Sequence, residues 1–508
     1  MKRFFLFLAA TVAISLTLSA QPGEFPGQSC TSIMVGRLAS TDGSVITSHT
    51  CDGRYRTWVT VEPAAKHKKG TMHKVYKGTM KTASPEDTTG VRLCGEIPEA
   101  RKTYAYLNTA YPCLNEKQLA MGETTFGGPD TLRNPGSLFM IEELERIALQ
   151  RCDNARDAIR LMGSLAEKYG YADGGECLTV ADKNEVWQFE ILGCGKGRTG
   201  AVWAARRIPD DHVGVSANIP RIGKLDRGDK DFCMASDNAE KVALEYGLWN
   251  GKGEFVFWRA YNCDYAQGHN FRDREFFILN ALAPSLGLTY DMDELPFSVK
   301  PDRNVDVREV IDLFRSTYEG TDFDMCRNVK MDSGVSPLAN PWLTTNMRKT
   351  LNTIAPGTVE FRRTVAVAWC AYSHIIQLRA SLPDAVGGVC WLSVDNPGQS
   401  PRIPVFCGTT TLPAEFGLCG QKKYDENAVV WKFRPANKLA TLSWQTTKEG
   451  FMENVMKAEQ NAFSAVNALS PDASAEALNA CTAAVFNEAA ALWNEMERGY
   501  WVLFGMGF

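Results

Sequence analysis

The 508-residue sequence lacks several short motifs that mark common metal, phosphate-binding and serine-hydrolase sites. It has only six histidines and contains neither an HExxH sequence nor a CxxC pair, so we expect no bound metal. A GxSxG nucleophile elbow and a P-loop are also missing. We therefore expect no cofactor. If the protein is an enzyme, its nucleophile is a residue other than an elbow serine.

The chain also lacks a strong net charge of either sign. The net charge is −4, the isoelectric point is near 6.0, and the basic run at residues 66–69 is short. This charge balance gives no electrostatic reason to bind nucleic acid or an anionic membrane. Beyond residue 20, no apolar run approaches the roughly 18 residues that a membrane span requires. We expect the mature protein to bind neither nucleic acid nor membrane, and its oligomeric state stays open.

Residues 1–20 have the layout of a secretory signal peptide. Two basic residues precede an apolar run at residues 4–18, and two small residues follow, ending at Ala20. This layout predicts cleavage after Ala20 and export to the periplasm or the extracellular space. Residues 21–29 would then form a short propeptide ahead of Cys30. A lipid-anchored Cys30 is the alternative, but the sequence Gly-Gln-Ser before it lacks the leucine expected three positions upstream.

The stretch at residues 29–53 predicts a β-hairpin that opens on a cysteine. Two β-prone runs, at residues 33–35 and 45–47, flank an Asp-Gly turn signal at residues 42–43. A cysteine at a mature amino terminus supplies its own base, because the α-amine has a reference pKa of about 7.7–8.0 and the thiol one of about 8.5. We therefore interpret Cys30 as a nucleophile. The alternative is a buried or disulfide-bonded Cys30, although the 15 cysteines cannot all pair within the chain.

The rest of the chain alternates strand and helix signals, with no internal repeat and no low-complexity linker. We expect one large domain at residues 30–508 with a helical C-terminal part at about 450–503. Strands followed by a helix pair and more strands predict a layered α/β (α+β) architecture, with sheets packed beneath helices. The expected strands lie at 57–61, 104–107, 201–205, 213–217, 364–371 and 388–394, with a hairpin at 177–191. The expected helices lie at 137–152, at 154–169 with Asp153 as its cap, at 272–282 and at 307–318.

The segment CTSIMVGRLASTDGSVITSHTCDG resembles the start of the bacterial secreted cysteine dipeptidases, a family of the N-terminal nucleophile (Ntn) hydrolases. The resemblance continues through LNEKQLAMGETTFGG, GECLTVADKNEVWQFEI, VGVSANIPRI and CAYSHIIQLR, and so extends to about Cys419. It implies a four-layer αββα sandwich with additional C-terminal helices. It also implies an exported enzyme that hydrolyses dipeptides through an N-terminal cysteine.

The same resemblance assigns expected roles to five residues. Cys30 matches the nucleophile, Asp52 the residue that holds its amine, and Asn218 an oxyanion-hole side chain. Oxyanion donors stabilise the tetrahedral intermediate of amide hydrolysis. Glu123 and Thr124, in the GETT sequence, lie where related amide hydrolases place another polar site residue, and we expect them to contact the substrate.

One position departs from the family pattern. Where many relatives have an arginine shortly before the aspartate that corresponds to Asp52, this chain has His49. We regard His49 as a further residue that could contact the substrate. A regular strand would place His49 and Asp52 on opposite faces, so we expect a bend if both are to approach Cys30. Two other functions stay open: an Ntn amide hydrolase that acts on N-acyl amino acids or bile-acid conjugates, and a secreted binding protein in which Cys30 is bridged.

Overall fold

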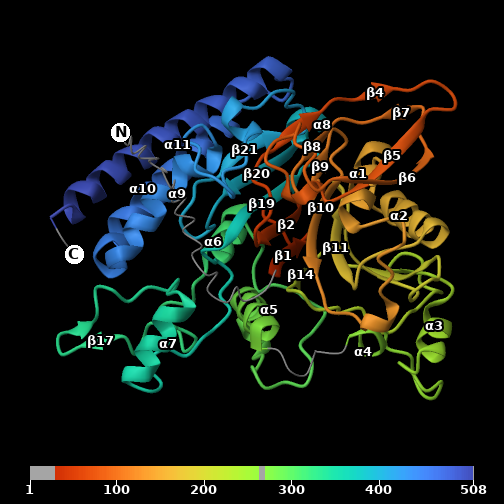
Figure 1. Ribbon diagram of the computed structural model, residues 1–508, viewed down its shortest axis with the longest axis horizontal. Helices are drawn as coiled ribbons and strands as arrows, with labels where there is room; N and C mark the ends of the chain where they lie inside the picture. The colour runs from red at the N-terminus through yellow and green to blue at the C-terminus, as the bar shows by residue number, and fades with distance from the viewer. Residues whose placement is uncertain (1–28, 263–268, 507–508) are drawn as a thin grey trace, which may run out of the picture.

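The computed structural model describes residues 29–262 and 269–506 (Figure 1). The expected signal peptide, residues 1–20, and residues 21–28 of the expected propeptide lie outside the described residues. Ser29, the last residue of the expected propeptide, is the first described residue and begins a strand.

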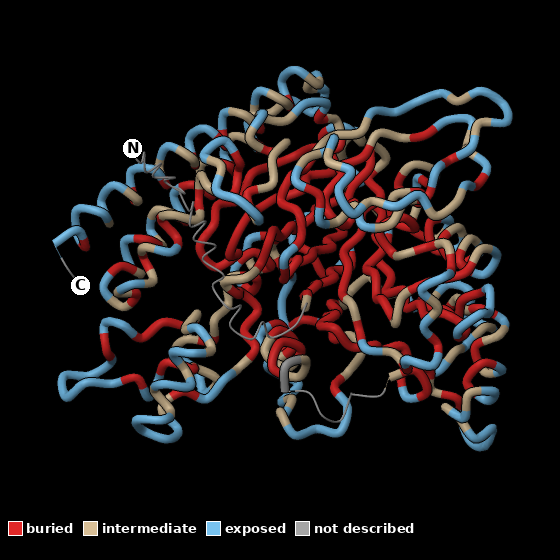
Figure 2. Tube along the Cα trace, in the orientation of Figure 1, coloured by how far each residue is buried: buried red, intermediate tan, exposed pale blue. Residues whose placement is uncertain are grey.

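The predicted hairpin forms the middle of a seven-stranded antiparallel sheet. Its turn contains Gly43, whose φ of 74° lies in the left-handed region that glycine adopts without a steric penalty. In spatial order, the sheet consists of β16 (Ser298–Val299), β14 (Val213–Ser216), β1 (Ser29–Val35), β2 (Val45–Asp52), β19 (Cys370–Leu378), β20 (Gly388–Val394) and β21 (Ile403–Phe406). Every residue of β2, β19 and β20 is buried, so these strands are covered on both faces (Figure 2).

A second antiparallel sheet has eight strands. In spatial order, these are β15 (Cys233–Ala235), β13 (Ala201–Arg207), β12 (Val186–Gly193), β11 (Glu176–Ala181), β10 (Ala120–Thr125), β9 (Leu114–Asn115), β8 (Tyr106–Asn108) and β3 (Thr60–Glu62). The hairpin expected at residues 177–191 is confirmed as β11 and β12. The GETT sequence lies on β10.

The two sheets contact each other through β1 and β2 on one side and β10 and β11 on the other. The hydroxyl oxygens of Thr47 and Thr179 are 2.5 Å apart across this contact. Gly122 permits the close approach, because a Cβ atom there would lie 2.3 Å from the backbone oxygen of Ser48. The site described below lies at this junction between the sheets.

Helices contact both sheets (Figure 1). α2 (Ala155–Tyr169) packs on β11, β12 and β13 beside α1 (Ile141–Arg151). At the other side of the molecule, α9 (Val429–Ala440), α10 (Trp444–Asn467) and α11 (Ala475–Phe504) pack on β20 and β21. α5 (His269–Leu282) contacts β14, and α6 (Val307–Arg315) contacts β19. The chain is therefore an α+β protein with antiparallel sheets, which agrees with the predicted fold class.

The smaller elements lie outside the two sheets. They are three two-stranded pairs, β4 (Ala65–Lys66) with β7 (Lys102–Thr103), β5 (Met72–Lys77) with β6 (Arg92–Pro98) and β17 (Lys330–Met331) with β18 (Gly334–Val335), and the helices α3 (Ala239–Glu245), α4 (Phe257–Tyr261), α7 (Thr345–Ile354) and α8 (Asp384–Gly387).

Two local predictions are wrong. The strand expected at 364–371 lies further along, at Cys370–Leu378, because the polar Ser373 and His374 are fully buried in β19 and interrupt the apolar pattern. The helix at 154–169 is capped by Asn154 and not by Asp153, since the Asn154 side chain accepts a hydrogen bond from the backbone N–H of Asp157.

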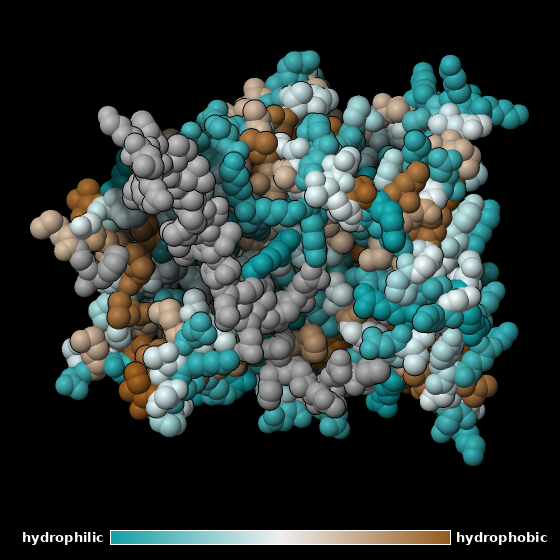
Figure 3. All heavy atoms as spheres, in the orientation of Figure 1, coloured by the Kyte–Doolittle hydropathy of each residue, from teal (hydrophilic) through white to brown (hydrophobic). Residues whose placement is uncertain are grey.

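The molecular face in Figure 3 is mostly hydrophilic, and apolar side chains occur on it in small separate groups. Among the helices of the described residues, none combines the length and the apolar character that a membrane crossing requires.

Candidate active site

Cys30 is the second residue of β1, where it pairs with Cys51 of the neighbouring β2. Its side chain is buried, and it is a free thiol. No disulfide joins any of the 14 cysteines that lie in the described ranges. This state of Cys30 speaks against the alternative in which the residue is bridged.

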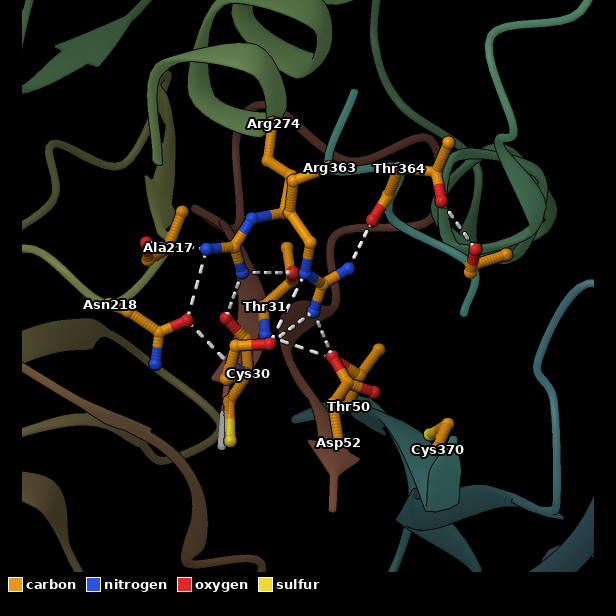
Figure 4. A network of polar contacts seen from close by, with 12 residues as sticks. Cys30, Thr31, Thr50, Asp52, Ala217, Asn218, Arg274, Arg363, Thr364 and Cys370 are labelled. Atoms are coloured by element: carbon orange, nitrogen blue, oxygen red, sulfur yellow. Dashed lines mark hydrogen bonds and ion pairs between the residues drawn. The ribbon is translucent and has the colours of Figure 1, made fainter. Parts of the chain in front are cut away.

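The thiol and the backbone nitrogen of Cys30 have different surroundings. The thiol donates to Oε2 of Glu123 on β10, over 3.4 Å. The backbone N–H donates to Oδ1 of Asn218, over 2.8 Å. In Figure 4 the sulfur points away from the two arginines that surround the backbone. Burial, followed by the nearby Glu123 carboxylate, raises the pKa of the Cys30 thiol well above its usual value.

Asn218 lies two residues after the end of β14 and adopts a φ of 65°, which is uncommon for a residue other than glycine. Its Oδ1 also accepts a hydrogen bond from Arg274, over 3.0 Å. Its Nδ2 donates to the backbone oxygen of Thr125, over 2.7 Å. Because a side-chain amide carries two N–H groups, the second one remains available to a further acceptor.

Asp52 ends β2 and pairs with Ser29 across the hairpin. Its Oδ2 accepts hydrogen bonds from Thr50, over 2.9 Å, and from Arg363. Its Oδ1 is buried without a hydrogen-bond partner among the described residues. A buried carboxylate oxygen without a donor is costly, so this atom is suited to a donor that the present chain does not supply.

His49 and Asp52 lie on opposite faces of β2, as expected, but the expected bend is absent. β2 pairs with β1 as a regular strand, and a ring nitrogen of His49 is within 4.8 Å of the Cys30 thiol. No bend is needed, because His49 lies on the face of the Cys30 side chain, whereas Asp52 lies beside the backbone at the start of β1.

The His49 ring is held inside the protein. Its Nδ1 lies 2.6 Å from the backbone oxygen of Glu123, and the ring packs against Tyr111, Tyr372 and His374. Burial lowers the pKa of His49 to about 4, so the ring is neutral at pH 7. His49 therefore does not supply the positive charge that an arginine would bring to this position.

The two GETT candidates have different surroundings. Glu123 accepts a hydrogen bond from Thr125 in addition to that from the Cys30 thiol. The Thr124 hydroxyl lies 2.5 Å from that of Ser216 on β14 and is buried. Glu123 is therefore beside the Cys30 thiol, whereas Thr124 connects the two sheets.

Two arginines that we did not identify from the sequence complete the site (Figure 4). Arg274, on α5, donates to the backbone oxygen of Cys30, to the Thr31 hydroxyl and to the backbone oxygen of Ala217. Burial, followed by the neighbouring Arg363, lowers the pKa of Arg274 to about 9. Each arginine lies more than 200 positions from Cys30 in the chain, and nothing in its local sequence distinguishes it from a surface arginine.

Cys30, His49 and Glu123 form the one group of potential metal ligands found in the described part of the chain. One donor atom from each lies within 4.8 Å of the others. Thiolate, imidazole and carboxylate are all ligands of Zn²⁺. Here the thiol and the carboxylate are hydrogen-bonded to each other, and the absence of a metal stays a prediction.

Comparisons with known proteins identify the family. The chain is 28% identical over 412 residues to a probable dipeptidase of Latilactobacillus sakei, covering 78% of each chain. It is 25% identical to a probable dipeptidase of Salmonella dublin, covering 75% of this chain and 81% of that protein. It is also 25% identical to probable dipeptidase B of Streptococcus pyogenes serotype M1, covering 58% of this chain and 54% of that protein. A model of peptidase family C69 matches residues 29–457. Since this match covers more than half of the chain, the protein belongs to peptidase family C69, which confirms the resemblance found in the sequence.

Proposed function

We propose that the protein is a dipeptidase in which Cys30, exposed as a new amino terminus, is the nucleophile. The observation that carries this proposal is the position of Cys30 between Glu123 at its thiol and Asn218 at its backbone nitrogen. Membership of peptidase family C69, and relatives named as dipeptidases, support hydrolysis of a peptide bond in a dipeptide.

The mature chain is proposed to begin at Cys30. In the chain that still carries Ser29, the nitrogen of Cys30 is an amide and cannot accept a proton. The raised pKa of the buried thiol makes a proton acceptor necessary, since only the thiolate is a good nucleophile. The unpartnered Oδ1 of Asp52, opposite Ser29, is suited to the ammonium that cleavage would create.

The proposed reaction has two steps. The Cys30 sulfur attacks the peptide carbonyl carbon while the α-amine takes the thiol proton, and the amine then returns this proton to the leaving amino acid. The second N–H of Asn218 Nδ2 and a backbone N–H would stabilise the oxyanion. Water then hydrolyses the thioester and restores the free thiol.

The fold is proposed to be the four-layer αββα sandwich of the Ntn hydrolases, with the C-terminal helices as an addition. Two facing antiparallel sheets, with α1 and α2 on one and α9 to α11 on the other, support this assignment. We further propose that residues 30–508 form a single domain and that residues 1–20 direct its export.

The test compares three purified proteins: a chain that begins at Cys30, a chain that retains residues 21–29, and the Cys30→Ala variant of the first. We expect dipeptide hydrolysis only by the first, measured as release of free amino acids. Circular dichroism checks that the Cys30→Ala variant is folded, since alanine is tolerated in a strand. Full activity of the chain that retains residues 21–29 would rule out the amine as the base.

A further inference from the structure

Two buried carboxyl groups, one of them beside the Cys30 thiol, have no cationic partner among the described residues. Glu123 on β10 and Glu176 on β11 are 0% and 2% exposed. Glu176 pairs with Thr125 across the two strands, so its side chain lies on the same face of the sheet as Glu123, two residues along β10. Within the described ranges, no lysine, arginine or histidine forms an ion pair with either group.

The two carboxyl groups are both harder to ionise than usual. Burial, followed by the neighbouring Glu123, raises the pKa of Glu176 well above its usual value, and burial also raises that of Glu123. With Glu176 protonated and Glu123 ionised, the pair carries one negative charge. A buried charge without a counter-charge is expensive, so a site of this kind calls for a cation from outside the chain.

One polar atom of the pair is unused. Oε2 of Glu176 is buried and has no hydrogen-bond partner among the described residues. The pair therefore requires two things from a ligand: a positive charge to balance Glu123 and an N–H or O–H donor for Oε2 of Glu176. An ammonium group, with three N–H donors and one positive charge, satisfies both requirements.

The distance to the thiol indicates which ammonium group this is. Oε2 of Glu123 lies 3.4 Å from Sγ of Cys30. A carbonyl carbon poised for attack lies about 3–3.5 Å from the sulfur. In a dipeptide, the α-nitrogen of the first residue is two bonds from that carbon. This nitrogen is then close enough to donate a charge-assisted hydrogen bond of about 2.7–2.9 Å to the Glu123 carboxylate.

We propose that Glu123 and Glu176 bind the free α-ammonium group of the substrate, so that cleavage occurs only after the first residue of a peptide. This inference rests on the proposed function and names the group on the substrate that the site recognises. It accounts for a second carboxylate that the hydrolytic mechanism does not use. It also predicts that removal of the substrate's amine is more harmful than a change in its side chain.

The test uses the mature enzyme with Ala-Ala and N-propionyl-alanine, which differ only in the α-ammonium group. We expect the wild type to prefer Ala-Ala by about 10- to 100-fold in kcat/KM, as expected for a buried charge-assisted contact. In Glu123→Gln this preference should fall to within about threefold, mainly through a higher KM for Ala-Ala. Glu142→Gln, which changes another buried glutamate, should keep the wild-type preference.

Each outcome decides between defined alternatives. If Glu123→Gln lowers kcat equally on both substrates, Glu123 activates the thiol and the inference is overturned. Equal hydrolysis of both substrates by the wild type would also overturn it, and this arm remains decisive if the variant fails to fold. If the mature wild type hydrolyses neither Ala-Ala nor other unblocked dipeptides, the proposed function itself has failed, whatever the role of the pair.

Discussion

Arg363 joins the two residues that face each other at the open end of the β1–β2 hairpin. Its guanidinium donates to the hydroxyl of Ser29, over 2.7 Å, and to Oδ2 of Asp52. Both Arg363 and Asp52 are buried. Removal of Ser29 would leave the ion pair with Asp52 intact, so Arg363 can hold Asp52 in place before and after maturation.

The Arg363→Ala variant should be strongly destabilised. It leaves the Asp52 carboxylate buried without its cation, a change that typically costs about 3–5 kcal/mol. Urea denaturation of the mature protein measures this loss. Arg37→Ala is the control, because it removes an exposed ion pair with Asp210 and should cost about 1 kcal/mol or less. Equal losses in the two variants would contradict the proposed role of Arg363.

The Asn218→Ala variant should lower kcat by about 10²–10³ with little change in KM. An oxyanion donor acts mainly as charge develops in the transition state, so its loss affects the chemical step. Steady-state kinetics on a dipeptide provide the measurement. If only KM rises, Asn218 binds the substrate and is not an oxyanion donor.

His49 should make the protein less stable in mild acid. Its pKa is lowered from about 6.5 to about 4, so the unfolded chain binds a proton in this range and the native state does not. Unfolding is therefore favoured as the pH falls through it, by about 3 kcal/mol in total. His49→Gln should lose correspondingly less stability between about pH 7 and pH 4, measured by urea denaturation. The same loss in both proteins would mean that His49 is protonated in the native state.

Gly122→Ala should lower both stability and activity. A Cβ at this position would lie 2.3 Å from the backbone oxygen of Ser48, so β10 has to move, and Glu123 moves with it. Overpacking of this kind costs about 1–3 kcal/mol. Gly223→Ala is the matched control, since its Cβ would have no neighbour within 4 Å. A Gly122→Ala enzyme with wild-type melting temperature and kcat would show that the two sheets have room to adjust.

The local sequence alone predicted the elements that have a clear turn signal or a clear periodicity. The Asp-Gly turn between two β-prone runs predicted the hairpin that carries Cys30, and helical periodicity predicted α1 and α2. β19 was misplaced because its polar Ser373 and His374 are buried between neighbouring strands, and only tertiary packing makes such residues compatible with a central strand.

The resemblance to a family pointed to Cys30, Asp52 and Asn218. The structure brings these residues together, and their catalytic roles stay predictions. Tertiary structure alone decided the rest of the site. Arg274 and Arg363 come from distant segments, and the partnership of Glu176 with Glu123 depends on the register between β10 and β11. Local sequence encodes which elements form, through periodicity and turn chemistry. Which buried charges meet depends on contacts between residues far apart in the chain, and no local pattern records these contacts.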